Sequence, residues 1–124
     1  PQRAEDISPS GWALDSGLRF SSHLDTPVTP LLPLQAVWSQ VHRMTYGGTV
    51  LGPQQRIGVM QALRAVTIDA AWQVFQDGNR GSLEAGKHAD LVVLSGNPLD
   101  DPMAMRALRV ERTVVGGATI YPAR

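Results

Sequence analysis

The feature that most constrains this chain is a strand-like segment that lies far from any other strand-like segment. Residues 18–23 alternate apolar and polar side chains with a period of two, which predicts a short strand. The next strand-like residues begin at Ala89. An isolated strand leaves its backbone hydrogen-bonding groups unpaired and is not stable by itself. We therefore expect this segment to pair with a larger structure, with a second copy of the chain or with a partner chain.

Apolar residues recur at helical spacing in the middle of the chain. Trp38 lies on one such apolar face and Trp72 lies in an alanine-rich stretch, so we expect both rings to pack in the core. Pro53 suits the first position of a helix, where its missing N–H costs nothing. The predicted helices span about 34–45, 53–66 and 67–76.

The C-terminal third is predicted to consist mostly of strands. A strand is expected over 89–94, and its apolar run should be buried. Residues 110–115 and 118–121 flank Gly116-Gly117, a two-residue signal for a hairpin turn. The pattern therefore divides the chain into a largely helical part, residues 1–80, and a β-rich part, residues 81–124.

Composition excludes several classes of protein. The chain has 124 residues with 11 Lys and Arg against 11 Asp and Glu, so no net charge attracts a nucleic acid. It contains no cysteine, which excludes disulfides and thiolate metal sites. No apolar run approaches the roughly 20 residues that span a bilayer. We expect no nucleic-acid or membrane partner and a cytoplasmic location, and the missing initiator Met suggests that residues precede Pro1.

His23 and Asp25 form the most chemically suggestive pair, just at and after the end of the predicted strand. Imidazole and carboxylate both bind zinc-like ions, and a carboxylate can take a proton from a metal-bound water. One such pair does not complete a catalytic zinc site, which typically has three protein ligands. For the H-x-D pattern taken alone, a polar strand residue followed by a turn-forming aspartate is the better explanation. His42 and His88 are expected to be solvent-exposed.

Several segments, in the right order, resemble the amidohydrolase superfamily. Gly81–Leu94 resembles the G-S-[IL]-E-x-G-K-x-A-D-[LF]-V-V-L segment found near the C-terminus of these enzymes. Ala62–Ala71 is similar to their A-L-R-x-x-T-x-N-A-A helix pair, and Asn97–Leu99 and Thr113–Gly117 are similar to their closing elements. His23–Pro30 resembles the H-x-D-x-P-V-x-P stretch of the family-3, YtcJ-like branch, which includes N-substituted formamide deformylases.

The resemblance implies an α/β fold: a metal-dependent hydrolase TIM barrel with a small β-sandwich assembled from both ends of the chain. Residues 1–80 would be the C-terminal part of the barrel, with its last strand–helix unit beginning at strand 18–23. Residues 81–124 would be the C-terminal strands of the composite β-sandwich. A whole barrel of eight strand–helix units takes about 250 residues, so this chain has room for one strand–helix unit together with the sandwich strands.

The resemblance also implies roles for individual residues. Asp25 matches the aspartate after the eighth barrel strand, which binds the metal or lies against it and handles the proton of the attacking water. His23, Thr26 and Val28 would contact substrate or orient Asp25. The complete enzyme would use one or two divalent ions, with zinc expected, to hydrolyse a C–N bond of amide or N-formyl type in a small molecule. This segment alone is expected to bind no metal and to be inactive.

A second hypothesis belongs to a different class: a truncated, non-catalytic chain with a structural or binding role. Such a chain would have to cover the barrel-facing side of its helices and the open edge of its strand, so it would be an oligomer. Under the first hypothesis the partners are an amide-like small molecule and either the remainder of the barrel or a second copy of the chain.

Overall fold

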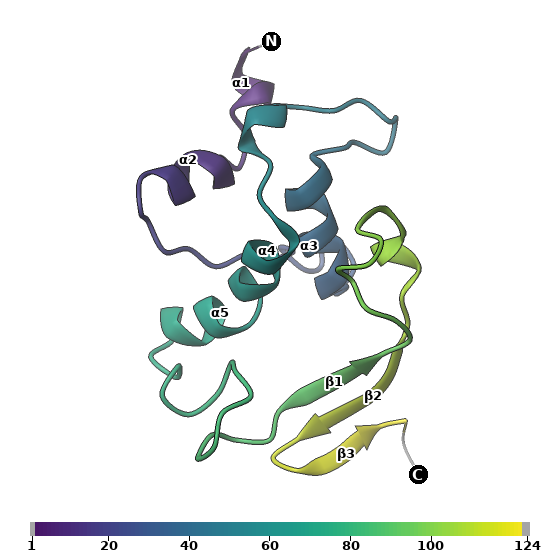
Figure 1. Cartoon of the computed structure of the whole chain (residues 1–124). Helices are drawn as coiled ribbons and strands as arrows, with labels where there is room; N and C mark the ends of the chain where they lie inside the picture. The colour runs from purple at the N-terminus through teal and green to yellow at the C-terminus, as the bar shows by residue number, and fades with distance from the viewer. Residues whose placement is uncertain (1, 123–124) are drawn as a thin grey trace.

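The computed structural model describes residues 2–122 and shows a helical part followed by a sheet (Figure 1). The predicted helices 34–45 and 67–76 are confirmed with shorter bounds, and the predicted helix 53–66 is divided into a 3-10 turn and an α-helix. The helical elements are α1 Gln2–Glu5, α2 Ser10–Asp15, α3 Pro33–His42, η1 Pro53–Gln55, α4 Val59–Ala65, α5 Ile68–Gln73 and η2 Met103–Ala107. The strands are β1 Leu91–Leu94, β2 Val110–Val115 and β3 Ala118–Tyr121.

Helix α3 is the centre of the hydrophobic core. Its side chains Val37 and Trp38 are buried and pack with Ile57, Ala62 and Met105. Met105 comes from η2 and is 0% exposed, so the C-terminal part of the chain contributes to the core of the helical part. The predicted burial of Trp38 is confirmed.

Two predictions of burial are wrong, because those side chains lie on surfaces that other described residues leave open. Trp72 is 40% exposed, and the Arg19 guanidinium lies 4.8 Å from the centroid of its ring. Val92 and Val93 of β1 are 55% and 42% exposed. Within residues 2–122, β1 gains its hydrogen bonds from β2 but gains little cover for its side chains.

The sheet is antiparallel, with strand order β1-β2-β3. The predicted hairpin is confirmed: Gly116 and Gly117 connect β2 to β3 with φ angles of 56° and 83°, as a turn with both central residues at positive φ requires. The Gly117 N–H donates to the Ala89 carbonyl at 3.0 Å, and the Gly116 N–H donates to Asp90 Oδ1 at 2.8 Å. These bonds attach the turn to the residues that precede β1.

The predicted strand 18–23 is wrong, because residues 18–24 run without the hydrogen-bond ladder of a strand. A strand needs a neighbouring strand, and the sheet of the described residues contains only β1, β2 and β3. The segment bonds instead to the helices, through the Ser22 N–H and the Ala65 carbonyl at 2.9 Å. The mixed helix and strand class is confirmed, while the barrel and the sandwich stay predictions.

Candidate functional site

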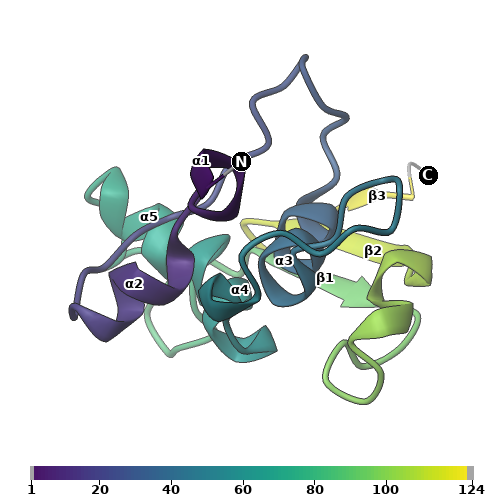
Figure 2. The ribbon, with the colours of Figure 1, turned by 90° about the horizontal axis from the view of Figure 1, so that it is seen from above.

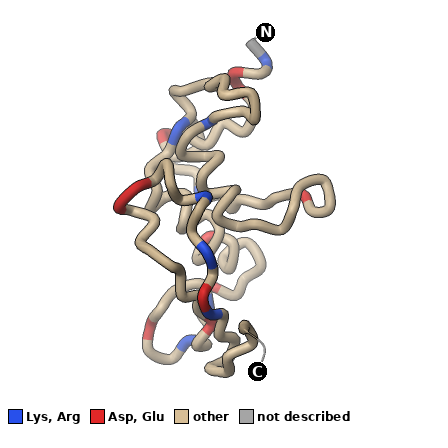
Figure 3. The backbone as a smooth tube through the Cα atoms, turned by 90° about the vertical axis from the view of Figure 1, so that its right-hand side faces the viewer, with Lys and Arg blue, Asp and Glu red and all other residues tan. Residues whose placement is uncertain are grey.

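The loop between residues 24 and 32 connects the extended segment to α3 and projects from the body of the molecule (Figure 2). Asp25, near its start, is the only Asp, Glu, Lys or Arg between Arg19 and Arg43. Figure 3 shows that this projecting loop is coloured almost entirely as uncharged residues. Val28 is 78% exposed, and Leu31 is also exposed. The loop therefore presents one negative charge on an otherwise uncharged surface.

Three hydrogen bonds hold the backbone around Asp25. The Asp25 N–H donates to His23 Nδ1 at 3.0 Å, and the Asp25 carbonyl accepts from the Val28 N–H at 2.7 Å. The Thr29 hydroxyl donates to the Leu24 carbonyl. Asp25 has a φ of 55°, in the left-handed region that aspartate tolerates better than most residues. The turn thus fixes the direction in which the chain leaves Asp25.

A cavity of about 470 Å³ lies beside this turn. His23, Asp25 and Thr26 line it together with apolar Leu31 and Pro33. Its volume falls within the range of about 300–1,000 Å³ that is typical of small-molecule sites. Three of the four predicted site residues therefore meet at one cavity.

Val28, the fourth predicted site residue, is absent from the lining of this cavity. It is exposed on the projecting loop, and its N–H is used in the turn that closes on Asp25. The backbone of Val28 therefore contacts Asp25, while its side chain faces solvent.

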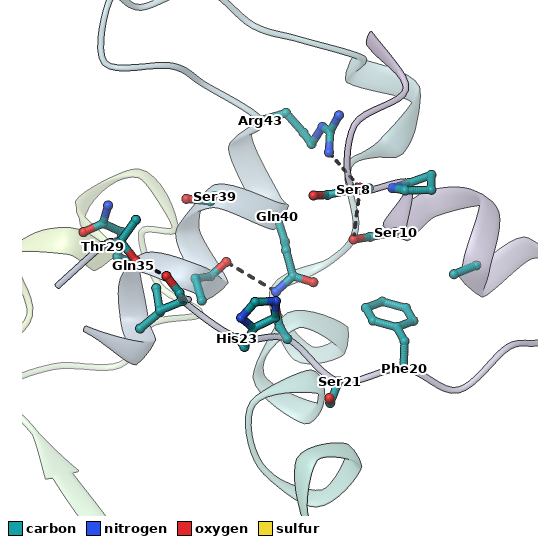
Figure 4. Close-up of a pocket in the computed structure, with 15 residues that line it drawn as sticks. Ser8, Ser10, Phe20, Ser21, His23, Thr29, Gln35, Ser39, Gln40 and Arg43 are labelled. Atoms are coloured by element: carbon teal, nitrogen blue, oxygen red, sulfur yellow. Dashed lines mark hydrogen bonds between the residues drawn. The ribbon is translucent and has the colours of Figure 1, made fainter. Parts of the chain in front are cut away.

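A second cavity, of about 510 Å³, is also lined by His23 and lies between the N-terminal segment and α3 (Figure 4). Arg43 borders it and donates to the carbonyls of Ser8 and Leu51, at 2.8 and 2.9 Å. Burial lowers the pKa of Arg43 from its ordinary value, and the charge of Glu5 opposes this shift. Arg43 therefore ties the N-terminal segment to the loop after α3.

The described residues do not make a metal site by themselves. Within residues 2–122, no three His, Cys, Asp or Glu side chains are grouped so that they could hold an ion. A catalytic zinc site typically needs three protein ligands, and Asp25 supplies one carboxylate. His88 is exposed as predicted. The predicted exposure of His42 is wrong, because its Nε2 lies 3.0 Å from the Pro102 carbonyl and the ring is partly buried.

Two contributors to this region could not be recognised from the sequence. Thr29 closes the turn around Asp25, and nothing in the pattern distinguishes it from the neighbouring Thr26. Arg19 holds the extended segment against α5, since its Nε donates to Asp69 Oδ1 at 2.6 Å. Opposite charges fifty positions apart carry no local signal, so this ion pair becomes visible only in the folded chain.

The structure therefore has an open cavity, bordered by Asp25, on a mixed helix and strand scaffold. The sequence profile described as the amidohydrolase family matches residues 1–121, and the chain belongs to that family. It is 38% identical over 109 residues to N-substituted formamide deformylase of Arthrobacter pascens, covering 87% of this chain and 20% of that protein.

A second relative is the putative amidohydrolase YtcJ of Bacillus subtilis strain 168, which is 28% identical over 112 residues. That match covers 87% of this chain and 21% of the relative. The chain therefore spans about a fifth of the length of these curated relatives.

A solved structure has a similar fold over most of this chain. The amidohydrolase from Thermotoga maritima MSB8 superposes with a TM-score of 0.67 at 26% sequence identity, over 87% of this chain and 24% of that one. The resemblance inferred from the motifs is confirmed. None of the described helices has the length and apolar character needed to cross a bilayer.

Proposed function

We propose that these residues form part of the active site of a metal-dependent amidohydrolase, which hydrolyses a C–N bond of amide or N-formyl type in a small molecule. The observation that carries this proposal is the Asp25 carboxylate at a cavity of about 470 Å³ in a chain of this family. The name of the 38% identical relative, N-substituted formamide deformylase, supports the N-formyl class. The other metal ligands and the rest of the barrel would come from residues beyond these 124.

The reaction adds a water oxygen to the carbonyl or formyl carbon and breaks the C–N bond. When bound, a divalent ion, zinc in this proposal, would polarise the carbonyl and lower the pKa of the attacking water. Asp25 accepts the proton that the water loses and delivers it to the leaving nitrogen. The products are a carboxylic acid and an amine. Thr26 lines the same cavity, where it would contact substrate, and Val28 would help to orient Asp25 through its N–H, which bonds to the Asp25 carbonyl.

The test uses the complete product of the gene that encodes these residues. Release of formate from an N-alkylformamide is compared with release of amine from the matched N-alkylacetamide. Asp25→Asn is expected to lower kcat by about 10²–10⁴-fold, the usual contribution of a general base. Asp15→Asn, at the exposed end of α2, is the matched control and should keep the activity.

Two results would contradict the proposal. If Asp25→Asn keeps the wild-type kcat, Asp25 is not the proton acceptor. If the wild-type protein, loaded with zinc, cleaves neither the formamide nor the acetamide, the proposed class of substrate is wrong.

The open sheet supports a second function, in which the chain has a structural or binding role as an oligomer. The outer edges of β1 and β3 pair with no other strand of residues 2–122, and Ile120 of β3 is exposed. Such edges pair readily with another chain. The partner would be the remainder of the barrel or a second copy, with no role for nucleic acid or membrane. Light scattering of the purified 124-residue chain tests this, and a strictly monomeric protein would contradict it.

A further inference from the structure

His23 contacts Asp25 through one particular ring nitrogen. Its Nδ1 accepts the hydrogen bond of the Asp25 N–H at 3.0 Å. Asp25 adopts a φ of 55°, a conformation that is unfavourable for a residue with a side chain unless its surroundings hold it. The His23 ring supplies the bond on the N-terminal side of Asp25, and the Val28 N–H supplies the bond to the Asp25 carbonyl.

The use of Nδ1 determines what the other ring nitrogen can do. A neutral imidazole has one nitrogen that accepts and one that carries the proton. Since Nδ1 accepts from the Asp25 backbone, the proton lies on Nε2. A metal ion needs a lone pair from its imidazole ligand, and Nε2 has none in this tautomer. To bind a metal through Nε2, the ring would have to move its proton to Nδ1 and lose the bond to Asp25.

His23 lines both cavities. Figure 4 shows the ring below the Gln40 amide at the wall of the larger cavity. In the part of the chain that the structure describes, Nε2 makes no hydrogen bond. An N–H in this position suits a neutral oxygen acceptor, such as the carbonyl of an amide or formamide.

We propose that the two ring nitrogens of His23 have different roles. Nδ1 accepts the Asp25 N–H and holds the backbone of that residue in position. Nε2 carries the proton, so it does not bind a metal and instead donates a hydrogen bond to the carbonyl oxygen of the substrate. The inference rests on the proposed function of Asp25. Because the two ring nitrogens make different hydrogen bonds, a substitution can remove one of these bonds and keep the other.

Two substitutions separate these tasks in the complete gene product. In His23→Asn the side-chain oxygen takes the place of Nδ1 and can accept the Asp25 N–H, while the Nε2–H is lost. In His23→Gln the side-chain amide reaches the place of Nε2 and can donate, while the acceptor for Asp25 is lost. His88→Asn, an exposed histidine outside both cavities, is the control.

We expect His23→Asn to raise KM about 10-fold with kcat within about 3-fold of the wild type, because substrate binding loses one hydrogen bond. We expect His23→Gln to lower kcat at least about 10-fold with a smaller change in KM, because Asp25 is no longer held in place. Both variants should keep the metal content of the wild type. Loss of metal in both, or the same change of kcat and KM in both, overturns the proposal.

A second measurement is independent of activity. Long-range ¹H–¹⁵N spectra of protein labelled at histidine distinguish the Nε2–H from the Nδ1–H tautomer, and the His23 signals are those that disappear in His23→Asn. We expect the Nε2–H tautomer in the wild type and also in Asp25→Asn, since the bond is to the backbone of residue 25. An Nδ1–H tautomer overturns the proposal, whatever the kinetics of Asp25→Asn say about the proposed function.

Discussion

The helical part and the sheet differ in what holds them in place. Helix α3 and its neighbours enclose fully buried side chains, among them Val37 and Met105. In the sheet every residue of β3 is exposed, and β2 has only two partly buried positions. Apolar packing therefore specifies the arrangement of the helices, whereas the glycine turn and the backbone hydrogen bonds set the pairing of the strands.

The largest expected effect tests whether the two regions share a core. Met105→Ala removes a fully buried side chain that reaches from η2 to α3, and we expect it to lower the free energy of unfolding by about 2–5 kcal/mol. Met103→Ala, in the same turn but 54% exposed, should change it by less than about 0.5 kcal/mol. Denaturant titrations followed by tryptophan fluorescence measure both variants. Equal effects would show that η2 does not belong to the core of the helices.

A smaller effect is expected from the turn of the sheet. Gly117→Ala places a side chain at a φ of 83° and should cost about 1–2 kcal/mol through the backbone, since no atom lies within 4 Å of the new Cβ. Hydrogen exchange should become faster in β2 and β3 and stay unchanged in α3. Gly78→Ala, which also meets open space but has no positive φ, is the control. An equal loss of protection in α3 would contradict the contrast between the two regions.

The smallest effect concerns Glu84, in the loop between the two regions. Hydrogen bonds from Ser82 and Lys87, together with the charge of Lys87, lower the pKa of Glu84. A carboxyl group whose pKa is lower in the folded chain contributes stability above its unfolded pKa, and this contribution is lost as the pH falls through the folded value. Glu84→Gln should therefore be slightly less stable than the wild type at neutral pH, and the difference should disappear in acid.

Thermal unfolding of the wild type and Glu84→Gln from neutral pH to about pH 3 measures this difference. Ser82→Ala removes the first of the two hydrogen bonds and should reduce the same pH dependence. A difference that grows as the pH falls would contradict the assigned cause.

Elements defined by neighbouring residues could be predicted from the sequence. The apolar spacing around Trp38 predicts α3, and Gly116-Gly117 predicts the hairpin, because both signals are local. The alternation in residues 18–23 is also local, but it carries no information about a partner strand, and the segment bonds to helices instead. The exposure of Val92 has the same cause. An apolar run shows that burial of its side chains is favourable, but it does not show which other residues bury them.

For the candidate site, the sequence predicted which residues lie together but not how they interact. His23 and Asp25 are two positions apart, so their proximity was certain, and Thr26 follows directly. The bond from the Asp25 N–H to Nδ1 depends on the left-handed backbone of Asp25, which no residue pattern specifies. The contribution of Thr29 depends on the path of the whole loop.

The attachment of the N-terminal residues to the helices has a consequence for chain entropy. The Trp12 N–H donates to Gln55 Oε1 across 43 positions, and Arg19 pairs with Asp69 across 50. The entropic cost of closing a loop rises only with the logarithm of the loop length, by about 0.6 kcal/mol for each doubling. Once the first of these contacts has formed, the second closes a loop of about 20 residues in place of 50, which lowers its entropic cost by about 0.8 kcal/mol. We expect them to form and break as one unit, which hydrogen exchange at the Ser22 amide would report.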